Sequence, residues 1–163
     1  MPLVCLPSLW LIAVNTFAWL IIQLGIGYFA VRISDDRFNP NSRLFKTRAW
    51  EKNGTLYQRV FKVSRWKSLL PSGGKFFGIF SINKFRSLKQ NYINKWLIES
   101  CRAEFTHWIA MFPAILFYLW NPFDAWIINI AYALCMNVPC IISQRYNRPR
   151  VLAIANMRHK ACR

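Results

Sequence analysis

The chain has 163 residues, a formal net charge of +16 and a hydrophobic content of 55%, so it has the length of one domain that is both basic and apolar. The apolar residues collect in long uncharged blocks with the charges between them, a pattern that excludes an ordinary soluble basic protein. Six acids face 22 Lys and Arg, so most cations need an outside partner, and we expect anionic membrane lipid rather than nucleic acid.

The first block, residues 1–31, contains no charged side chain. A membrane span needs about 20 apolar residues, so this block is predicted to form one transmembrane helix. A cleaved signal peptide is the alternative, but no Lys or Arg precedes Arg32 and Tyr28-Phe29-Ala30-Val31 is a poor cleavage context. Asn15 and Gln23 lie eight residues apart, so they share a helix face and are expected to bond another helix.

Residues 32–104 form a basic segment that is predicted to lie at the membrane surface. Asn39-Pro40-Asn41 indicates a loop that leaves the membrane. Between residues 45 and 70, aromatic side chains alternate with Lys and Arg, and Trp66-Lys67 is one such pair. This alternation fits either a nucleic-acid surface or a segment lying among lipid headgroups. Because apolar spans flank the segment, we favour the headgroup interpretation.

The end of the basic segment is predicted to be an amphipathic helix. Residues 71–75 indicate a turn, and they are not a phosphate-binding loop because the Walker spacing is missing. The helix is predicted to begin at Asn83 and to run directly into the next apolar block. Its apolar residues recur at intervals of three and four, as in Phe85, Leu88, Tyr92 and Trp96.

Two further apolar blocks, residues 105–123 and 125–142, flank the turn signal Asn121-Pro122-Phe123-Asp124. Residues 105–143 are therefore predicted to form a transmembrane hairpin, followed by a basic cytoplasmic tail at 144–163. Positive residues remain in the cytoplasm, which places the N-terminus and the turn outside a bacterial cell membrane. The expected fold is an all-α membrane protein with about three transmembrane helices and a basic amphipathic or interfacial cytoplasmic segment.

Two of the six acids lie close to one of the two histidines just before the hairpin. On a helix, Glu104 and His107 are neighbours at i and i+3, and so are Glu99 and Arg102. A carboxylate beside an imidazole orients a general base and raises its basicity, so His107, Glu104 and Glu99 are the catalytic candidates. The alternative is that Glu99 and Arg102 form only an ion pair and that His107 is only a headgroup anchor.

A second group of polar residues occupies the last predicted span and its exit. Polar groups at membrane depth are costly unless they are paired or line a wet cavity. Amide side chains can hydrogen-bond sugar hydroxyls, and Arg can form two parallel hydrogen bonds to a carboxylate or phosphate, so the group is a candidate substrate site. For two members, Asn137 and Arg145, an equal alternative is hydrogen bonding between helices followed by a basic segment that ends the span. The group comprises Asn129, Asn137, Gln144, Arg145, Asn147, Arg148 and Arg150.

Three strings in the chain resemble one known family, the glycosyl-4,4'-diaponeurosporenoate acyltransferases, which are small membrane proteins of Gram-positive bacteria. The likeness runs from about Phe45 to Arg150, and its last string is the most specific because chance rarely assembles it after an apolar span. The strings are Trp50-Glu51-x-x-Gly54-x-x-Tyr57 with Arg65-Trp66-Lys67, then Glu99-x-x-Arg102-Ala103-Glu104-x-x-His107-Trp108, and Asn137-Val138-Pro139 leading into Gln144-Arg145-Tyr146-Asn147-Arg148-Pro149-Arg150.

The resemblance implies esterification of a fatty acid onto a glucose hydroxyl of a glycosylated carotenoid, the last step towards a staphyloxanthin-type pigment. It implies a fatty acyl donor, either acyl-CoA or acyl carrier protein, and a glycosylated carotenoid or other glycolipid as acceptor. His107, oriented by Glu104, would remove the proton of the sugar hydroxyl. We expect substrate contacts from Arg102, Trp108, Asn129, Asn137, Gln144, Arg145, Asn147, Arg148, Arg150, Trp66 and Lys67.

The predicted chemistry requires no cofactor or metal, since the five cysteines lack CxxC spacing and the second histidine lies in the tail. The pattern of soluble acyltransferases, His followed by Asp four or five residues later, is absent, because Met111 and Phe112 occupy those positions. Two alternatives remain open from the sequence. One is a non-catalytic basic membrane protein that binds anionic lipid or scaffolds lipid- and pigment-synthesis enzymes, and the other is a different reaction on an isoprenoid or lipid.

Overall fold

The computed structural model describes residues 7–70, 80, 82 and 85–161, with side chains described as far as residue 157. Throughout these residues, every regular element is a helix, which confirms the all-α prediction. The predicted turn at residues 71–75 lies outside the described part of the chain.

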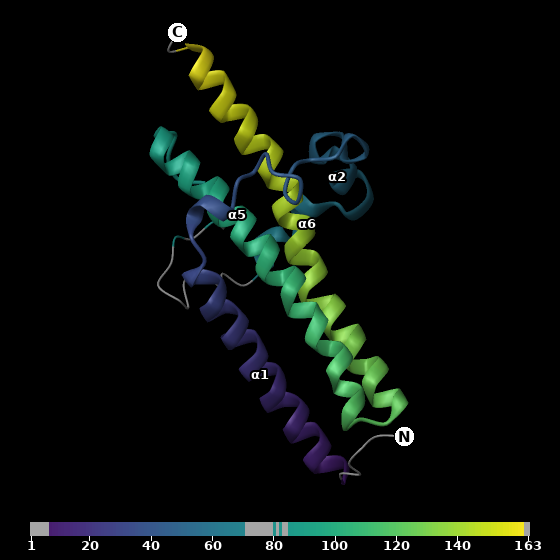
Figure 1. Ribbon diagram of the computed structural model, residues 1–163. Helices are drawn as coiled ribbons and strands as arrows, with labels where there is room; N and C mark the ends of the chain where they lie inside the picture. The colour runs from purple at the N-terminus through teal and green to yellow at the C-terminus, as the bar shows by residue number, and fades with distance from the viewer. Residues whose placement is uncertain (1–6, 71–79, 81, 83–84, 162–163) are drawn as a thin grey trace.

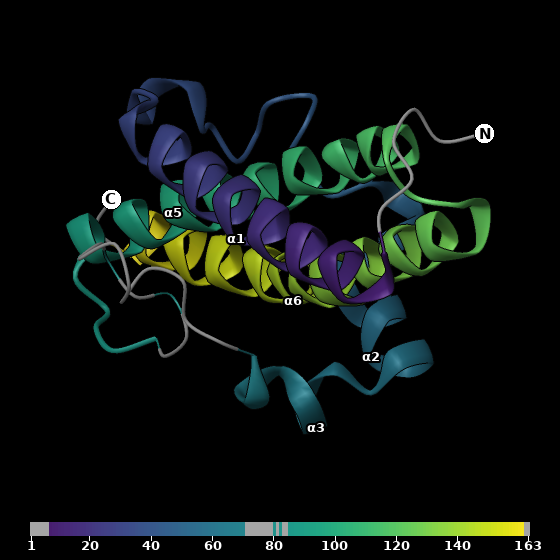
Figure 2. The same cartoon turned by 90° about the horizontal axis from the view of Figure 1, so that it is seen from below.

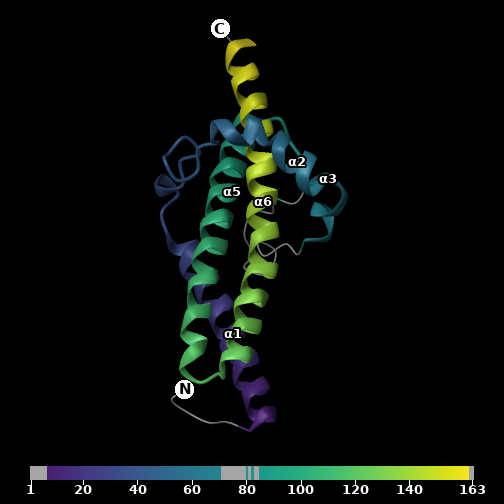
Figure 3. The same cartoon turned by 90° about the vertical axis from the view of Figure 1, so that its right-hand side faces the viewer.

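Three long helices make up most of the structure: α1 (Ser8–Arg32), α5 (Gln90–Met111) and α6 (Phe123–Ala161) (Figure 1). α5 and α6 lie side by side, and α1 packs mainly against α5 (Figure 3). The first turns of α1 and the connection into α6 lie at one end, whereas the C-terminal end of α1, the start of α5 and the second half of α6 lie towards the other (Figure 1).

Short helical turns follow α1, and four of them, η2, α2, α3 and η3, pack against α6, whereas Asp35 of η1 pairs with α5. Figure 2 shows them outside the three long helices, with α2 and α3 on the side of α6 that faces away from α1. They are η1 (Asp35–Arg37), η2 (Ala49–Gly54), α2 (Thr55–Phe61), α3 (Val63–Trp66) and η3 (Lys67–Leu69).

α1 is apolar on every side and is bound to its neighbours by side-chain amides. The Asn15 side chain donates to Asn121 Oδ1 at 2.8 Å, and Trp120 donates back to Asn15 Oδ1 at 2.8 Å. Trp19 Nε1 donates to Asn129 Oδ1 on α6 at 2.8 Å. Asn15 therefore bonds the turn between η4 and α6 rather than another helix, and Gln23 makes no side-chain hydrogen bond to a described residue.

Two helices are long and apolar enough to cross a membrane, namely α1 and residues Phe123–Met157 of α6. The most apolar 18-residue window of α1 has only 6% of its residues buried, so α1 is not the core helix of a soluble domain. The apolar block at 105–123 is divided, since α5 ends at Met111 and η4 (Phe112–Leu119) follows it as a 3-10 helix. A third span therefore stays a prediction.

α6 is continuous through the expected boundary between the last span and the tail at residue 143. Its 39 residues extend for about 58 Å and include Pro139 and Pro149. Proline lacks an N–H group, so Pro149 leaves the carbonyl of Arg145 without its helical donor. The second half of α6 thus carries the basic string away from the apolar part on the same rigid element.

α5 begins at Gln90, later than the predicted start at Asn83. Residues 85–89 are not helical, and Lys89 has an extended backbone with φ −61° and ψ 136°. The backbone N–H of Lys89 donates to Ser87 Oγ at 3.2 Å, and that of Arg86 donates to the Tyr92 hydroxyl at 3.0 Å. Such local side-chain bonds compete with the helical ladder and delay the start of the helix.

Candidate functional site

His107 on α5 pairs with Asn137 on α6, and this pair is the strongest candidate for a reactive centre. His107 Nδ1 lies 2.9 Å from Asn137 Oδ1, while Asn137 Nδ2 donates to the carbonyl of Ala133 at 2.8 Å. The amide oxygen is therefore the acceptor, and Nδ1 carries the proton of a neutral imidazole. Nε2 then holds a free lone pair, and no described residue hydrogen-bonds to it.

The predicted orientation of His107 by Glu104 was wrong. The two residues are neighbours on α5, but the Glu104 carboxylate turns towards α6, where Arg145 Nε lies 2.7 Å from Oε1. Arg148 Nη1 lies 2.6 Å from Oε2 as an ion pair, and Trp108 Nε1 donates to Oε1 at 3.3 Å. Two guanidinium charges attract a buried carboxylate more strongly than one neutral imidazole does, so Asn137 orients His107 instead.

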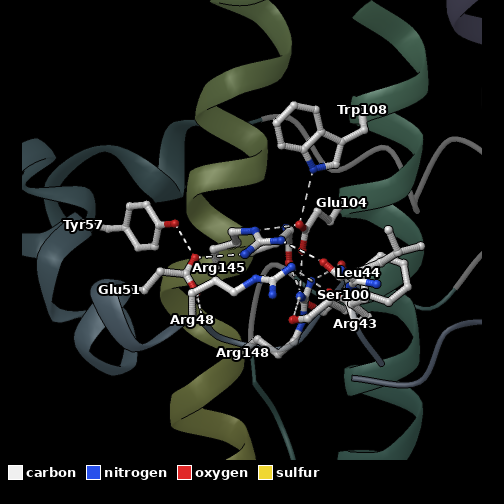
Figure 4. Close-up of polar contacts among 12 residues, drawn as sticks. Arg43, Leu44, Arg48, Glu51, Tyr57, Ser100, Glu104, Trp108, Arg145 and Arg148 are labelled. Carbon is white, nitrogen blue, oxygen red and sulfur yellow. Dashed lines mark hydrogen bonds and ion pairs between the residues drawn. The ribbon is translucent and has the colours of Figure 1, made fainter. Parts of the chain in front are cut away.

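Glu104 belongs to a buried cluster that joins α5, α6 and η2, and Figure 4 shows its members converging. Arg145 bridges two carboxylates, since its Nη1 donates to Glu51 Oε1 at 3.0 Å while its Nε bonds Glu104. Glu51 also accepts from the Tyr57 hydroxyl at 2.5 Å and from the backbone N–H of Arg48 at 2.5 Å. Glu51 and Glu104 have no solvent exposure.

Arg148 completes this cluster from a side chain with only 1% exposure. Its Nη2 donates to the carbonyl of Ser100 at 2.9 Å and its Nη1 to that of Phe45 at 3.1 Å. Ser100 Oγ in turn donates to Gln144 Oε1 at 3.1 Å. The predicted residues Gln144, Arg145 and Arg148 thus converge on one place with Glu104.

Two carboxylates and two guanidinium groups balance the charge of the cluster. Burial by itself raises the pKa of the Glu51 carboxyl, but hydrogen bonds from Tyr57, the Arg48 backbone and Arg145 hold that pKa below its usual value. Burial and the neighbouring Glu51 carboxylate raise the pKa of Tyr57. Glu51 is therefore ionised and fully hydrogen-bonded, which makes it a structural acceptor rather than a base.

Glu99 and Arg102 form the predicted ion pair, with Arg102 Nε 3.2 Å from Glu99 Oε2. Arg102 also donates to the carbonyls of Ala30 at 2.7 Å and Ile33 at 2.6 Å, at the C-terminal end of α1, and it pairs with Asp35. These contacts support the interpretation as an ion pair, because Arg102 fastens the end of α1 to α5.

The other predicted substrate residues lie apart from His107. Asn129 accepts the hydrogen bond from Trp19 on α1. Asn147 accepts one from Lys67 Nζ at 2.8 Å, and Arg150 lies over the ring of Tyr146 at 3.6 Å. Trp66 Nε1 donates to the carbonyl of Phe61 at 2.7 Å, within the basic segment itself.

The neighbouring candidates for a covalent nucleophile are buried and inert. Cys101 has no exposure and packs with Phe38 and Phe45, and burial raises the pKa of its thiol to about 11. Ser100 Oγ is engaged with Gln144 and also accepts from Arg148 Nε at 3.3 Å. In the described part of the chain, no three His, Cys, Asp or Glu side chains are grouped to hold a metal ion.

Glu51 and Tyr57 were not predicted as site residues, although both stand in the first of the three strings. Their only signal was their place in that string, and local spacing suggested no role for either residue. Asp35 was not predicted as a site residue either. Its partners, Arg102 and Lys95, are far along the chain, so no local spacing pointed to them.

The comparisons with known proteins agree on one class. The family model for glycosyl-4,4'-diaponeurosporenoate acyltransferase matches residues 41–157. The protein of that name from Staphylococcus haemolyticus (strain JCSC1435) is 31% identical over 158 residues, covering 94% of this chain and 92% of the relative. Its namesake from Staphylococcus aureus (strain MRSA252) is 40% identical over 134 residues, covering 82% and 81%. No solved structure shows a significant match.

The protein is thus an acyltransferase, as its matching relatives are named. It belongs to the glycosyl-4,4'-diaponeurosporenoate acyltransferase family.

Proposed function

We propose that this protein transfers a fatty acyl group onto a sugar hydroxyl of a glycosylated carotenoid, with His107 as the general base. The acceptor follows from the names of the relatives. The observation that carries the catalytic assignment is the bond between His107 Nδ1 and Asn137, because it leaves Nε2 unprotonated and free of described partners. A neutral imidazole fixed in this tautomer is suited to proton abstraction near pH 7.

In the proposed reaction, Nε2 of His107 accepts the proton of the sugar hydroxyl. At the same time, the hydroxyl oxygen attacks the carbonyl carbon of an acyl thioester. The carbon–sulfur bond breaks, and the leaving thiolate takes the proton back from the imidazolium. The products are the sugar ester and a free thiol, and His107 is regenerated. The Asn137 amide accepts from Nδ1 throughout, so it stabilises the positive charge that forms on the ring.

We further propose that the enzyme is a multi-pass protein of the cell membrane with its basic end in the cytoplasm. The exposed apolar surface of α1 supports insertion. Every Lys and Arg lies in residues 32–102 or 145–163, and the described members of both ranges lie towards the end of the bundle where α1 terminates. This one-sided charge supports a cytoplasmic basic segment and contact with anionic lipid.

The decisive test of the reaction is His107→Ala, with the second histidine changed in His159→Ala as the matched control. Lipids extracted from cells producing each variant would be compared by mass spectrometry at equal protein level. Loss of a general base lowers the rate by about 10²–10⁴-fold, so the acylated pigment should disappear in His107→Ala and persist in the control. Unchanged acylated product in His107→Ala would contradict the proposal and favour a non-catalytic scaffold.

A further inference from the structure

A groove with a volume of about 450 Å³ lies between the loop after α1 and the second half of α6. This volume falls in the range of pockets that hold small ligands. The loop side contributes Asn41, Lys46 and Asn53, and the helix side contributes Arg150 and Asn156. The groove therefore places two cations on facing walls among hydrogen-bonding amides.

The two cations of the groove have no carboxylate side chain as partner. The sequence contains six acids, and all six lie in the described part of the chain. Four of them pair with Lys95, Arg102, Arg145 or Arg148, and none forms an ion pair with Lys46 or Arg150. Among the described residues, Arg150 bonds only the carbonyl and the ring of Tyr146. The groove thus has a positive charge that only an outside anion can neutralise.

A third cation, Lys67, strengthens this potential. Its Nζ lies 5.1 Å from the centroid of the Tyr146 ring, the same ring on which Arg150 stacks. Burial and the charge of Arg150 both lower the pKa of Lys67, in agreement with the lack of a counter-ion.

The groove wall at Asn53 is held by strained backbone. Lys52 (φ 47°), Asn53 (φ 53°) and Gly54 (φ 82°) are consecutive left-handed residues, which is costly for the first two. Gly54 lets this turn press on α6, since a Cβ there would lie 3.0 Å from the Tyr146 carbonyl oxygen and 3.3 Å from Arg150 Nη1. Strain of this kind persists at ligand clamps when the surrounding structure enforces it.

We propose that this groove binds the phosphate groups of the acyl donor, and that the donor is a nucleotide thioester of the coenzyme A class. The inference rests on the proposed function and names its second substrate. Two facing cations match the two phosphates of a diphosphate, and the Asn side chains match the hydrogen-bonding groups of a nucleotide.

The position of the groove fits a donor with a long arm. α6 rises by about 20 Å between Asn137 and Arg150, so the phosphate site is well separated from His107 along the helix pair. A pantetheine arm extends from such a phosphate to its thioester, which places the reactive carbon at a distance from the charged end of the donor. The groove thus anchors the donor without occupying the site of proton transfer.

The test measures binding of unacylated coenzyme A to the purified full-length protein in nanodiscs of zwitterionic lipid. Lys46→Ala is the informative variant, because Lys46 is exposed and makes no ion pair whose loss would disturb the fold. Loss of one charge-assisted bond should weaken binding about tenfold. Lys89→Ala, an exposed cation away from the groove, should bind like the wild type, and pyrophosphate should compete.

Equal affinity in Lys46→Ala and the wild type would overturn the inference. Protection of Lys46 from an amine reagent by phosphatidylglycerol but not by coenzyme A would also overturn it, because the groove would then be a lipid-headgroup site. The binding assay needs no acceptor and is repeated in His107→Ala. Binding should be retained in His107→Ala, because the groove does not contain His107. Wild-type protein that binds coenzyme A but forms no acylated product would count against the proposed function alone, whereas wild-type transfer without coenzyme A binding would count against this inference alone.

Discussion

Arg148 offers the sharpest test of the buried charge cluster. Replacement by Met keeps much of the side-chain volume but removes the guanidinium that faces Glu104 Oε2 at 2.6 Å. It also leaves the carbonyls of Ser100 and Phe45 without the donor that now lies 2.9 Å and 3.1 Å from them. The variant Arg148→Met therefore leaves one buried charge half-paired and two buried acceptors unpaired.

The expected cost follows from these contacts. Removal of one partner from a buried ion pair destabilises a protein by about 3–5 kcal/mol. Because Arg145 still holds the other oxygen of Glu104 at 2.7 Å, we expect the lower end, about 3 kcal/mol. For a chain of this length, that loss lowers the Tm by about 10 °C.

Thermal unfolding of the detergent-solubilised protein, followed by circular dichroism, measures this effect. Arg59→Met, an exposed cation on α2, is the control and should change stability by less than about 0.5 kcal/mol. The double variant Glu104→Gln with Arg148→Met should recover at least half of the loss, since the unbalanced carboxylate is gone. A decrease in Tm of less than about 3 °C for Arg148→Met would refute this account of the cluster, and so would a double variant that recovers no stability.

Two further outcomes follow from the backbone and from the end of α1. Gly54→Ala should lower the free energy of unfolding by about 1–2 kcal/mol, because the left-handed φ of 82° and the Tyr146 carbonyl oppose a Cβ. Gly25→Ala, which has open space around the added Cβ, should not lower it. Equal thermal unfolding of the two variants would contradict this prediction. Hydrogen bonding from Lys95, together with the charges of Lys95 and Arg102, lowers the pKa of Asp35, so its stabilisation is present above the ordinary carboxyl pKa and is lost as pH falls below about 4. The stability difference between wild type and Asp35→Asn should vanish over that acidic range, and a difference that persists at pH 2 would rule out this linkage.

Local spacing was enough for the features that depend on one helix or on one amide. Glu99 and Arg102 pair because i and i+3 positions always adjoin on a helix, and this prediction is confirmed. Asn15 bonds a distant part of the chain, the turn at Asn121, because an amide in an apolar helix has few other ways to satisfy its hydrogen bonds. Such inferences use only the period of the helix and the cost of an unpaired polar group.

Long-range choices lay beyond the same reasoning. His107 is three residues from Glu104 along the chain and was the obvious local partner. The actual partners of Glu104, Arg145 and Arg148, lie on another helix. The sequence does not state how α5 and α6 are rotated about their axes, so it cannot rank a local neutral partner against two distant charged ones. Asn137 was in the predicted set, but its role as the orienting group became visible only when both helices were in place.

The Lys52–Gly54 turn illustrates a different limit. Asn53-Gly54 is an ordinary signal for left-handed backbone, yet the sequence alone does not show that this turn faces α6. Gly54 lies against the carbonyls of Tyr146 and Arg145, and the Arg145 carbonyl is the one that Pro149 leaves without a helical donor. The sequence indicates the turn and the helix-interrupting proline separately, but it does not show that the two lie side by side.

The amide contacts of α1 also control how this helix is rotated about its own axis. α1 is apolar all round, so in an apolar medium no face is preferred on hydrophobic grounds. Asn15 meets Asn121 in the turn between η4 and α6, and Trp19 meets Asn129 on α6, at only one rotation of α1 about its axis. At the other end, the bonds from Arg102 to the carbonyls of Ala30 and Ile33 fix the position of α1 along that axis. Directional hydrogen bonds therefore set the rotation and the axial position of α1 against its neighbours, which its apolar surface alone would leave undetermined.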